Sequence, residues 1–150
     1  MKHEVLLAKL VAAVITLLTL IGIARADEAW IDNLFSRYRA PKELTSIVIS
    51  AGEKFGIDPK VIAAIIVVES SAKPKAVSKG GDYGLMQICW KVHKKDIQRR
   101  FPSIKAAEDL LDPSVNVQIG TEIFARYSSQ RNTLRGALLR YSDGNEMMAE

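Results

Sequence analysis

A single carboxylate, Glu69, stands at the end of an almost unbroken apolar run over residues 61–68. Two serines, Ser70 and Ser71, follow it. An ionised carboxylate is costly to bury, so a glutamate in apolar surroundings finds polar partners or has a raised pKa. A carboxylic acid that keeps its proton near neutral pH can act as a general acid. Position alone leaves two readings open: Glu69 carries acid–base chemistry, or it ends a buried helix and turns to solvent.

The other reactive residue types leave few competing chemistries. The chain has two histidines, His3 and His93, and one cysteine, Cys89, whose thiol would need His93 as its base. The spacings H-E-x-x-H and C-x-x-C are absent, and Gly80-Gly81 follows no predicted strand. The sequence therefore predicts no metal site, no phosphate-binding loop and no cofactor. Four further acids lie in polar sequence and are expected at the surface: Glu53, Asp82, Glu108 and Glu122.

The N-terminal segment has the pattern of a targeting sequence. Residues 10–23 are uncharged and largely apolar, Lys2 and Lys9 precede them, and an A-x-A pattern follows at residues 24–26. This order is typical of a secretory signal peptide. The run is short for a membrane span, which needs about 20 residues, but a retained membrane anchor is the alternative. We therefore expect an exported, periplasmic protein with a signal peptide or membrane anchor at residues 1–26.

The length and net charge of the chain limit the kinds of binding partner that we expect. The 150 residues suffice for one domain, and the net charge of +4 would fall to +2 without residues 1–26, which hold three basic residues and one acidic residue. Such a mild charge suits an anionic polymer without requiring one. A basic cluster is expected to form a solvated helix face: Lys91, Lys94, Lys95, Arg99 and Arg100. No aromatic residues interleave with it, so no nucleic-acid binding is predicted.

Apolar residues at helical spacing predict a mainly α fold. Residues 27–42 are expected to form an N-terminal helix, and Pro41 to open the next one. Gly56 is the expected C-cap of that second helix. Asp58-Pro59 then combines an N-cap with proline at the first helical position, and a helix apolar nearly all round runs from there to Glu69. This third helix is expected at the centre of the domain.

The second half of the chain is also expected to be helical. Residues 71–83 are predicted as a loop with at most a short β-hairpin, and helical pattern resumes near Leu85. A short helix is expected over residues 103–110. Asp112-Pro113 repeats the start signal and predicts a long helix to about Ser129. The predicted last helix starts from a cap at Asn132 or Thr133 and ends near Tyr141.

Three blocks follow one another in the second part of the chain. The first runs from E-S at residues 69–70 through A-V-S at 76–78 to G-L-M-Q-I at 84–88. The second is D-P-S-V-N-V-Q-I-G at residues 112–120, and the third is A-L-L-R-Y-S-D-G-N at residues 137–145. In their order, and in the spacing of the first block, they resemble the lytic transglycosylases, whose catalytic domain is lysozyme-like. The resemblance implies a lysozyme-like catalytic domain over residues 43–150.

The resemblance also implies a reaction. Glu69 matches the catalytic acid, which would protonate the oxygen of the MurNAc–GlcNAc β-1,4 bond in peptidoglycan. It would then accept the proton of the muramoyl C6 hydroxyl, which attacks C1 and leaves a 1,6-anhydro-MurNAc end. Because the nucleophile belongs to the substrate, one carboxylate suffices, whereas ordinary glycoside hydrolases use two.

Further site residues follow from the same resemblance. Ser78 matches a serine that lines the site, and Met86 and Gln87 match residues of the cleft floor. Tyr141 matches a tyrosine whose hydroxyl orients the acid. Ser142 stands where the family usually has asparagine and keeps a hydrogen-bonding group with less reach.

Two alternatives remain beside this reading. A hydrolytic muramidase is disfavoured because the sequence shows no well-placed second carboxylate. Asp82 is a separate departure from the family: it stands where a small alanine is common and would place a charge near the mouth of the cleft. A non-enzymatic peptidoglycan-binding assembly subunit is suggested by Ser142 and by a chain that stops shortly after Gly144, where many relatives continue into a further helix.

The compact form of the domain points to a setting for the activity. It resembles the transglycosylases of secretion, conjugation, pilus and phage systems. This resemblance implies peptidoglycan glycan strands as substrate and local wall remodelling during the passage of a large assembly. It also implies association with the virion if the protein is phage-encoded.

Overall fold

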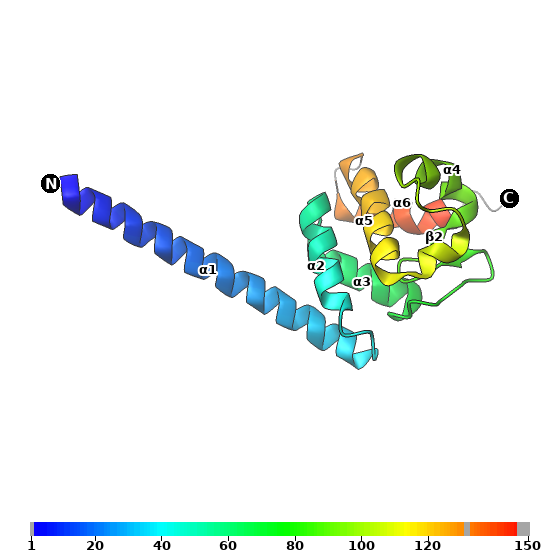
Figure 1. Ribbon diagram of the computed structural model, residues 1–150, viewed down its shortest axis with the longest axis horizontal. Coiled ribbons are helices and arrows are strands. Elements are labelled where there is room, and N and C mark those ends of the chain that lie inside the picture. The colour runs from blue at the N-terminus through cyan, green and yellow to red at the C-terminus, as the bar shows by residue number, and fades with distance from the viewer. Residues whose placement is uncertain (1, 131–132, 147–150) are drawn as a thin grey trace.

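The computed structural model describes residues 2–130 and 133–146, without the side chains of residues 2–8, 20–21, 23–24 and 143–146. A long helix, α1 (Lys2–Arg37), projects away from a body that the later elements form (Figure 1). The body contains, in order, α2 (Leu44–Phe55), α3 (Pro59–Ser70), β1 (Asp82–Tyr83), β2 (Ile88–Cys89), α4 (Trp90–Arg100), the 3-10 helix η1 (Ala107–Leu111), α5 (Pro113–Ser129) and α6 (Leu134–Glu146). The predicted mainly α fold with a short β-hairpin is confirmed.

Helix α1 is continuous, where the sequence suggested a leader followed by a separate helix. Its C-terminal part is attached to the body because Ile31 and Phe35 are buried. Thr45 also donates a hydrogen bond from Oγ1 to Asp32 Oδ1 (2.6 Å). An ion pair between Lys60 Nζ and an Asp27 oxygen (2.6 Å) joins α1 to α3. These contacts hold the last third of α1 against α2 and α3.

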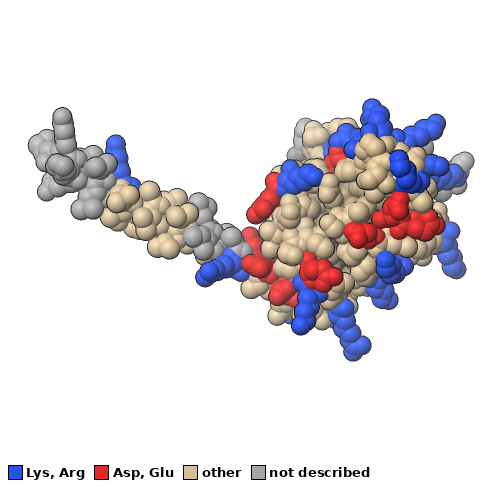
Figure 2. Space-filling model, in the orientation of Figure 1, with Lys and Arg blue, Asp and Glu red and all other residues tan. Residues whose placement is uncertain are grey.

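The part of α1 that projects from the body exposes apolar side chains to solvent. The exposed large ones are Leu10, Val11, Val14, Ile15, Leu17 and Leu18. Figure 2 shows this stretch as an uncharged segment, whereas basic and acidic side chains are interspersed over the visible face of the body. Among the residues that the structure describes, no helix has both the length and the apolar character that a membrane crossing requires. The assignment of residues 1–26 as signal peptide or anchor stays a prediction.

The local start and stop signals act as the sequence predicts. Gly56 ends α2 in the left-handed conformation (φ 67°), which glycine adopts without steric cost. Asp58 caps α3 by accepting a hydrogen bond at Oδ1 from the Lys60 N–H (2.8 Å), and Pro59 is its first residue. Asp112 caps α5 in the same way through the Val115 N–H (2.9 Å). The helix predicted from Asp58-Pro59 to Glu69 is therefore confirmed.

Other boundaries differ from the predictions. Helix α2 starts at Leu44 and not at Pro41. The segment near Leu85 is a turn between two short strands, and the helix expected there begins only at Trp90. In the antiparallel hairpin Asp82 is opposite Cys89 and Tyr83 is opposite Ile88, so the hairpin begins at the end of the expected 71–83 loop and continues beyond it to Cys89.

The last two predicted helices also need revision. The helix expected over residues 103–110 is the 3-10 segment η1. Helix α6 continues past Tyr141 to Glu146. Thr133 precedes α6 and accepts a hydrogen bond at Oγ1 from the Gly136 N–H (3.1 Å), whereas the alternative cap, Asn132, lies outside the described residues.

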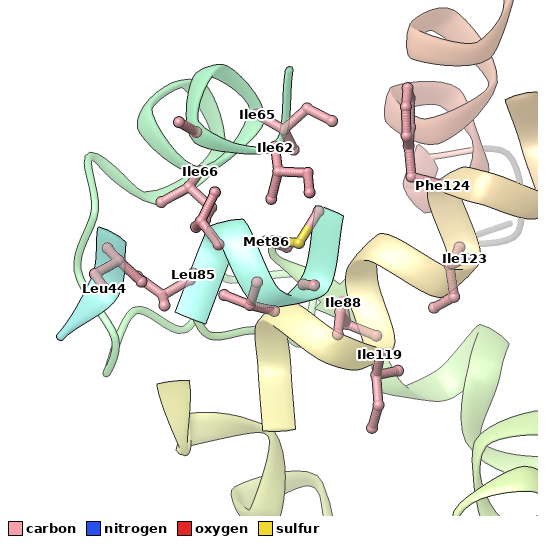
Figure 3. Packing of buried hydrophobic residues seen from close by; sticks show 14 of the residues in the cluster. Leu44, Ile62, Ile65, Ile66, Leu85, Met86, Ile88, Ile119, Ile123 and Phe124 are labelled. Atoms are coloured by element: carbon pink, nitrogen blue, oxygen red, sulfur yellow. The ribbon is translucent and has the colours of Figure 1, made fainter. Parts of the chain in front are cut away.

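The core surrounds α3, as its apolar sequence predicts. Ile62, Ala63 and Ile66 are fully buried, and α3 contacts both α1 and α2. Figure 3 shows side chains of α2, α3, α5 and residues 85–88 pointing toward one another. One face of α3 is not covered, however, because Val68 is 81% exposed. That uncovered face is where Glu69 lies.

The surface prediction fails for Glu122. This residue of α5 is buried and forms an ion pair with Arg100 at the end of α4. Arg126, one turn further along α5, pairs with Asp96 of α4 (2.6 Å). Two ion pairs therefore join α4 to α5. The lysines of the basic cluster on α4 are exposed, as expected of a solvated helix face.

Candidate active site

Glu69 lies on the last turn of α3 and faces a groove between α3 and α6. The groove has a volume of about 670 Å³. Its lining residues are Lys60, Val61, Ala64, Ile65, Val68, Glu69, Leu134, Arg135, Leu138, Leu139, Tyr141 and Ser142. Glu69 is the one acidic residue among these lining residues. We call this cavity the α3–α6 groove.

The surroundings of Glu69 favour its protonated form. Burial raises the pKa of the Glu69 carboxyl above its ordinary value of 4.5, and the nearby charge of Asp82 raises it further. Within the described residues, no hydrogen bond or ion pair holds the Glu69 carboxyl in its charged form. A half-buried carboxyl without a cationic partner keeps its proton to higher pH, as a general acid requires.

A sharp turn directly after Glu69 carries the chain away from the groove. Ser71 and Ala72 both adopt the left-handed conformation, with φ of 52° and 57°. Their N–H groups donate to the carbonyls of Val67 (3.0 Å) and Ile66 (3.4 Å) and so close the helix. Ala72 is buried and anchors the turn. Glu69 is thereby left at the end of α3, with no following helical turn beside it.

Tyr141 reaches the site from α6. Its hydroxyl donates a hydrogen bond to the main-chain carbonyl of Met86 (2.9 Å), and its ring makes edge-to-face contacts with Phe124 and Tyr127. Burial raises the pKa of Tyr141 well above its ordinary value, and the charge of Glu69 adds to this effect. Tyr141 is therefore neutral and near Glu69, and its hydroxyl proton is used in the hydrogen bond to the Met86 carbonyl.

Met86 and Gln87 are not among the residues that line the groove. Met86 is fully buried, and its N–H donates to Asn116 Oδ1 (2.8 Å). Gln87 is buried with φ of 47°, and its Nε2 donates to the carbonyls of Gly84 (2.8 Å) and Ala76 (3.3 Å). In this structure both residues support the loop that precedes α4.

Ser78 forms the centre of a tight turn. Its Oγ donates to Asp82 Oδ2 (2.6 Å) and accepts from the N–H groups of Gly80 and Asp82 (both 3.1 Å). The sequence predicted a surface position for Asp82. In the structure Asp82 is half-buried, and its Oδ1 is shielded from solvent.

Asn116 is a structural residue to which sequence reasoning gave no role. It is fully buried near the start of α5 and accepts the hydrogen bond from the Met86 N–H. Its Nδ2 donates to the carbonyls of Tyr83 (2.8 Å) and Leu110 (2.7 Å). Gly84 leaves room for this amide, because a Cβ there would lie 2.2 Å from Asn116 Nδ2. The presence of this asparagine inside the 112–120 block was the sequence signal that could have indicated its structural role.

The predicted site residues thus fall into two groups. Glu69, Tyr141 and Ser142 line the α3–α6 groove together. Ser78, Met86 and Gln87 do not line it; Ser78 and Gln87 donate hydrogen bonds within the 76–88 segment, and the Met86 N–H donates to Asn116 of α5. Within the described residues, no group of His, Cys, Asp and Glu is arranged to hold a metal ion.

Comparison with known proteins assigns a family to this arrangement. The transglycosylase SLT domain matches residues 46–150, which is more than half of the chain. The chain therefore belongs to the transglycosylase SLT domain family. The predicted lysozyme-like domain of the lytic transglycosylases is confirmed at this level.

Among curated proteins, the chain is similar to two enterobacterial relatives. It is 37% identical over 73 residues to the endo-type membrane-bound lytic murein transglycosylase A of Citrobacter koseri. It is 39% identical over 75 residues to the protein of the same name from Klebsiella pneumoniae. Each alignment covers 47% of this chain and 36% of the relative, so the chain matches about a third of the length of these proteins.

Proposed function

We propose that this protein is a peptidoglycan lytic transglycosylase with Glu69 as its only catalytic acid and base. The observation that carries the proposal is the half-buried Glu69 carboxyl with a raised pKa in the α3–α6 groove. Membership of the transglycosylase SLT domain family and similarity to lytic murein transglycosylases support it.

Glu69 serves twice in the proposed reaction. Its proton passes to the glycosidic oxygen between MurNAc and GlcNAc as the bond from that oxygen to C1 of MurNAc breaks. The resulting Glu69 carboxylate then accepts the proton of the C6 hydroxyl of the same MurNAc, whose oxygen bonds to C1. The product has a 1,6-anhydro end, Glu69 is protonated again, and no water is consumed. The tethered hydroxyl replaces the second carboxylate of a hydrolase by proximity.

Tyr141 and Ser142 have supporting roles in this proposal. Tyr141 fixes the wall of the groove through the Met86 carbonyl and keeps an uncharged oxygen near the acid. Ser142 is exposed in the groove and offers a hydroxyl to the sugar. Ser78, Met86 and Gln87 act one layer behind, where they hold the 76–88 segment in place.

The mass of the products tests the proposal. Purified glycan strands are digested with the protein, and the soluble muropeptides are analysed by mass spectrometry. A transglycosylase gives ends that are lighter by one water than those of a muramidase and have no reducing group. Reducing ends throughout the digest would refute the assignment.

Asp82 is the reason to test the muramidase alternative, because it is a second carboxylate. The sequence offered no well-placed second carboxylate, yet the charge of Asp82 acts on Glu69. A second carboxylate could activate water, as in inverting glycosidases. The mass measurement decides between the two reactions in a single experiment.

We infer that residues 1–26 direct export of the protein to the periplasm. The exposed apolar side chains on the projecting part of α1 support this inference. Expression in a Gram-negative host followed by intact-mass measurement tests it. Loss of residues 1–26 from a periplasmic product is the outcome for a signal peptide, and the full mass in the membrane fraction is the outcome for an anchor. A full-length cytoplasmic protein would refute export.

We further propose that the cleavage thins the wall locally so that a large assembly of a secretion, conjugation, pilus or phage system can pass. The resemblance to compact transglycosylases supports this role. Genetic complementation tests it: an inactive Glu69→Gln variant should fail to restore passage in a strain that lacks the protein. If the variant restored passage fully, the non-enzymatic assembly-subunit alternative would be favoured.

A further inference from the structure

The proposed reaction gives no role to α4, the helix that carries the basic cluster of the sequence. We propose that the exposed face of α4 is a second binding surface for peptidoglycan, which attracts the acidic peptide stems of the glycan strands. We call this surface the α4 basic face and define it by Lys91, Lys94 and Lys95, all of which are exposed. This inference rests on the proposed function, because the substrate of that function is the ligand.

The excess positive charge of the chain is located on α4. The 11 residues of this helix contain three lysines, two arginines and one aspartate, which gives a net charge of +4. The whole chain has 21 basic and 17 acidic residues and the same net charge of +4. Without the five basic residues and the one acidic residue of α4, the rest of the chain holds 16 of each and is neutral. By net charge, an anionic polymer is therefore attracted to this one helix.

Ion pairs within the protein involve the arginines at the end of α4 and not its lysines. Arg99 pairs with Asp96 (2.6 Å), and Arg100 pairs with Glu122 of α5. Asp96 is the acidic residue of α4, and its other oxygen pairs with Arg126 of α5 (2.6 Å). Within the described part of the chain, no lysine of the α4 basic face forms an ion pair. The charges of these three lysines are therefore not neutralised by the protein itself.

Helix α4 presents the lysines outward because its opposite side is packed against the body. His93 and Ile97 are one turn apart, and both are buried. Lys91 and Lys95 are also one turn apart, and a helix with 3.6 residues per turn places them on the side opposite the buried pair. The ion pairs between α4 and α5 hold the helix in this orientation. The α4 basic face is therefore carried by a fixed helix and not by a loop.

The positions of the lysines are unfavourable for α4 by itself. Lys91 lies in the first turn, which has no acidic residue, and a positive charge there opposes the helix dipole. Lys91 and Lys95 are four residues apart, a spacing at which like charges destabilise a helix. Lys94 is partly compensated, because its Nζ lies 5.9 Å from the centroid of the Trp90 ring. A local charge pattern that disfavours the helix indicates a binding role, and an anionic ligand would remove the repulsion.

The location of α4 favours peptide stems over a membrane surface as the partner. Helix α4 lies on the side of the body away from the projecting part of α1 (Figure 1). The apolar side chains that suit lipid are on that projecting part, so a membrane that holds α1 would lie away from α4. Lysine is a point charge on a flexible side chain, which suits the scattered carboxylates of peptide stems. No residue of α4 lines the α3–α6 groove, so stem binding leaves Glu69 accessible to the glycan.

The experiment compares native glycan strands with strands whose stem carboxyl groups have been converted to amides. The variant replaces Lys91, Lys94 and Lys95 by glutamine, and binding is measured in a Glu69→Gln background so that the strands stay intact. We expect native strands to bind about 5–20-fold more weakly at roughly 50 mM salt, because each exposed charge pair contributes little alone. At roughly 500 mM salt the two proteins should agree within about twofold, because the charges are screened. The amidated strands should bind the variant no more weakly than the unsubstituted protein.

A matched control separates the α4 basic face from net charge. Arg37→Gln, Lys42→Gln and Lys54→Gln together remove three exposed positive charges outside α4. The net charge falls by the same three units as in the α4 variant, and native strands should bind within about twofold of the unsubstituted protein. Circular dichroism verifies the fold of each variant. If the α4 variant does not fold, Lys91→Gln with Lys95→Gln replaces it, and vesicles of phosphatidylglycerol test the membrane as an alternative partner.

The outcomes distinguish this inference from the proposed function. Unchanged binding of native strands by the folded α4 variant at low salt overturns the inference, as does an equal loss in the control variant. Binding of vesicles through the three lysines, with no contribution of these lysines to strand binding, overturns it as well. A wild-type protein without cleavage activity refutes the proposed function, and strand binding in the Glu69→Gln background then still decides on the α4 basic face. In the catalytically intact protein, a raised KM with an unchanged kcat for native strands supports both.

Discussion

Replacement of Glu69 by glutamine is the most direct perturbation of the site. The amide keeps the size and shape of the side chain and removes its exchangeable acid proton. Within the described residues Glu69 makes no hydrogen bond or ion pair, so the change breaks no visible contact. General acid–base catalysis contributes about 10²–10⁴-fold to a rate, and Glu69 serves in both steps. We expect the cleavage rate to fall by at least about 10³-fold.

The same variant should change stability in a direction that depends on pH. The folded pKa of Glu69 is raised, so above the ordinary value of 4.5 the unfolded chain loses this proton before the folded protein does. Wild-type stability from this group is therefore full below about pH 4.5 and is lost as pH rises through the folded pKa. Glutamine does not titrate. The variant should match the wild type at low pH and be more stable at neutral pH, by less than about 1 kcal/mol because the group is partly solvated.

Two assays check this reasoning together. Release of soluble muropeptides gives the rate, and urea unfolding followed by circular dichroism at several pH values gives the stability difference. Wild-type activity should also fall as pH rises through the Glu69 pKa. A folded Glu69→Gln protein with activity within tenfold of wild type would show that the acid lies elsewhere. A variant less stable than wild type at neutral pH would contradict the electrostatic argument.

Three further substitutions test the support of the site. Asn116→Ala removes three hydrogen bonds of a buried side chain and should lower the free energy of urea unfolding by roughly 2–4 kcal/mol; a loss below about 1 kcal/mol would contradict its role. Gly84→Ala places a methyl group against the Asn116 amide at φ 75° and should prevent soluble expression or cost at least about 2 kcal/mol in the same assay. Tyr141→Phe removes the 2.9 Å bond to the Met86 carbonyl and should cost about 1–2 kcal/mol, with a lower rate at unchanged product chemistry; unaltered stability and rate would refute a positioning role.

The sequence was most informative where a feature depends on neighbours along the chain. Gly56 needs only its own left-handed conformation, and Asp58 needs only the N–H of Lys60, two residues away. The three blocks in their order then led to the correct family and to Glu69 at the end of the central helix. Such local and ordered signals survive in a single sequence because they do not depend on the packing of distant segments.

The sequence was least informative about which polar groups are buried. Glu122 and Asp82 lie among polar residues in the sequence. In the structure, however, Glu122 is paired with Arg100, and Asp82 is partly buried in the hairpin. The hydroxyl of Tyr141 reaches the Met86 carbonyl across 55 residues, a contact that the spacing of the blocks does not specify. These arrangements depend on how α4, α5 and α6 pack around the hairpin.

The single cysteine makes the hairpin accessible to experiment. Cys89 is 5% exposed, and burial raises the pKa of its thiol, so alkylating reagents meet little thiolate while the hairpin is closed. We expect labelling to occur mainly when β2 separates from β1, which also separates Asp82 from Cys89. The rate of Cys89 alkylation in the unmodified protein would then report how often the hairpin opens, and a bound glycan strand that stabilises the hairpin would lower this rate.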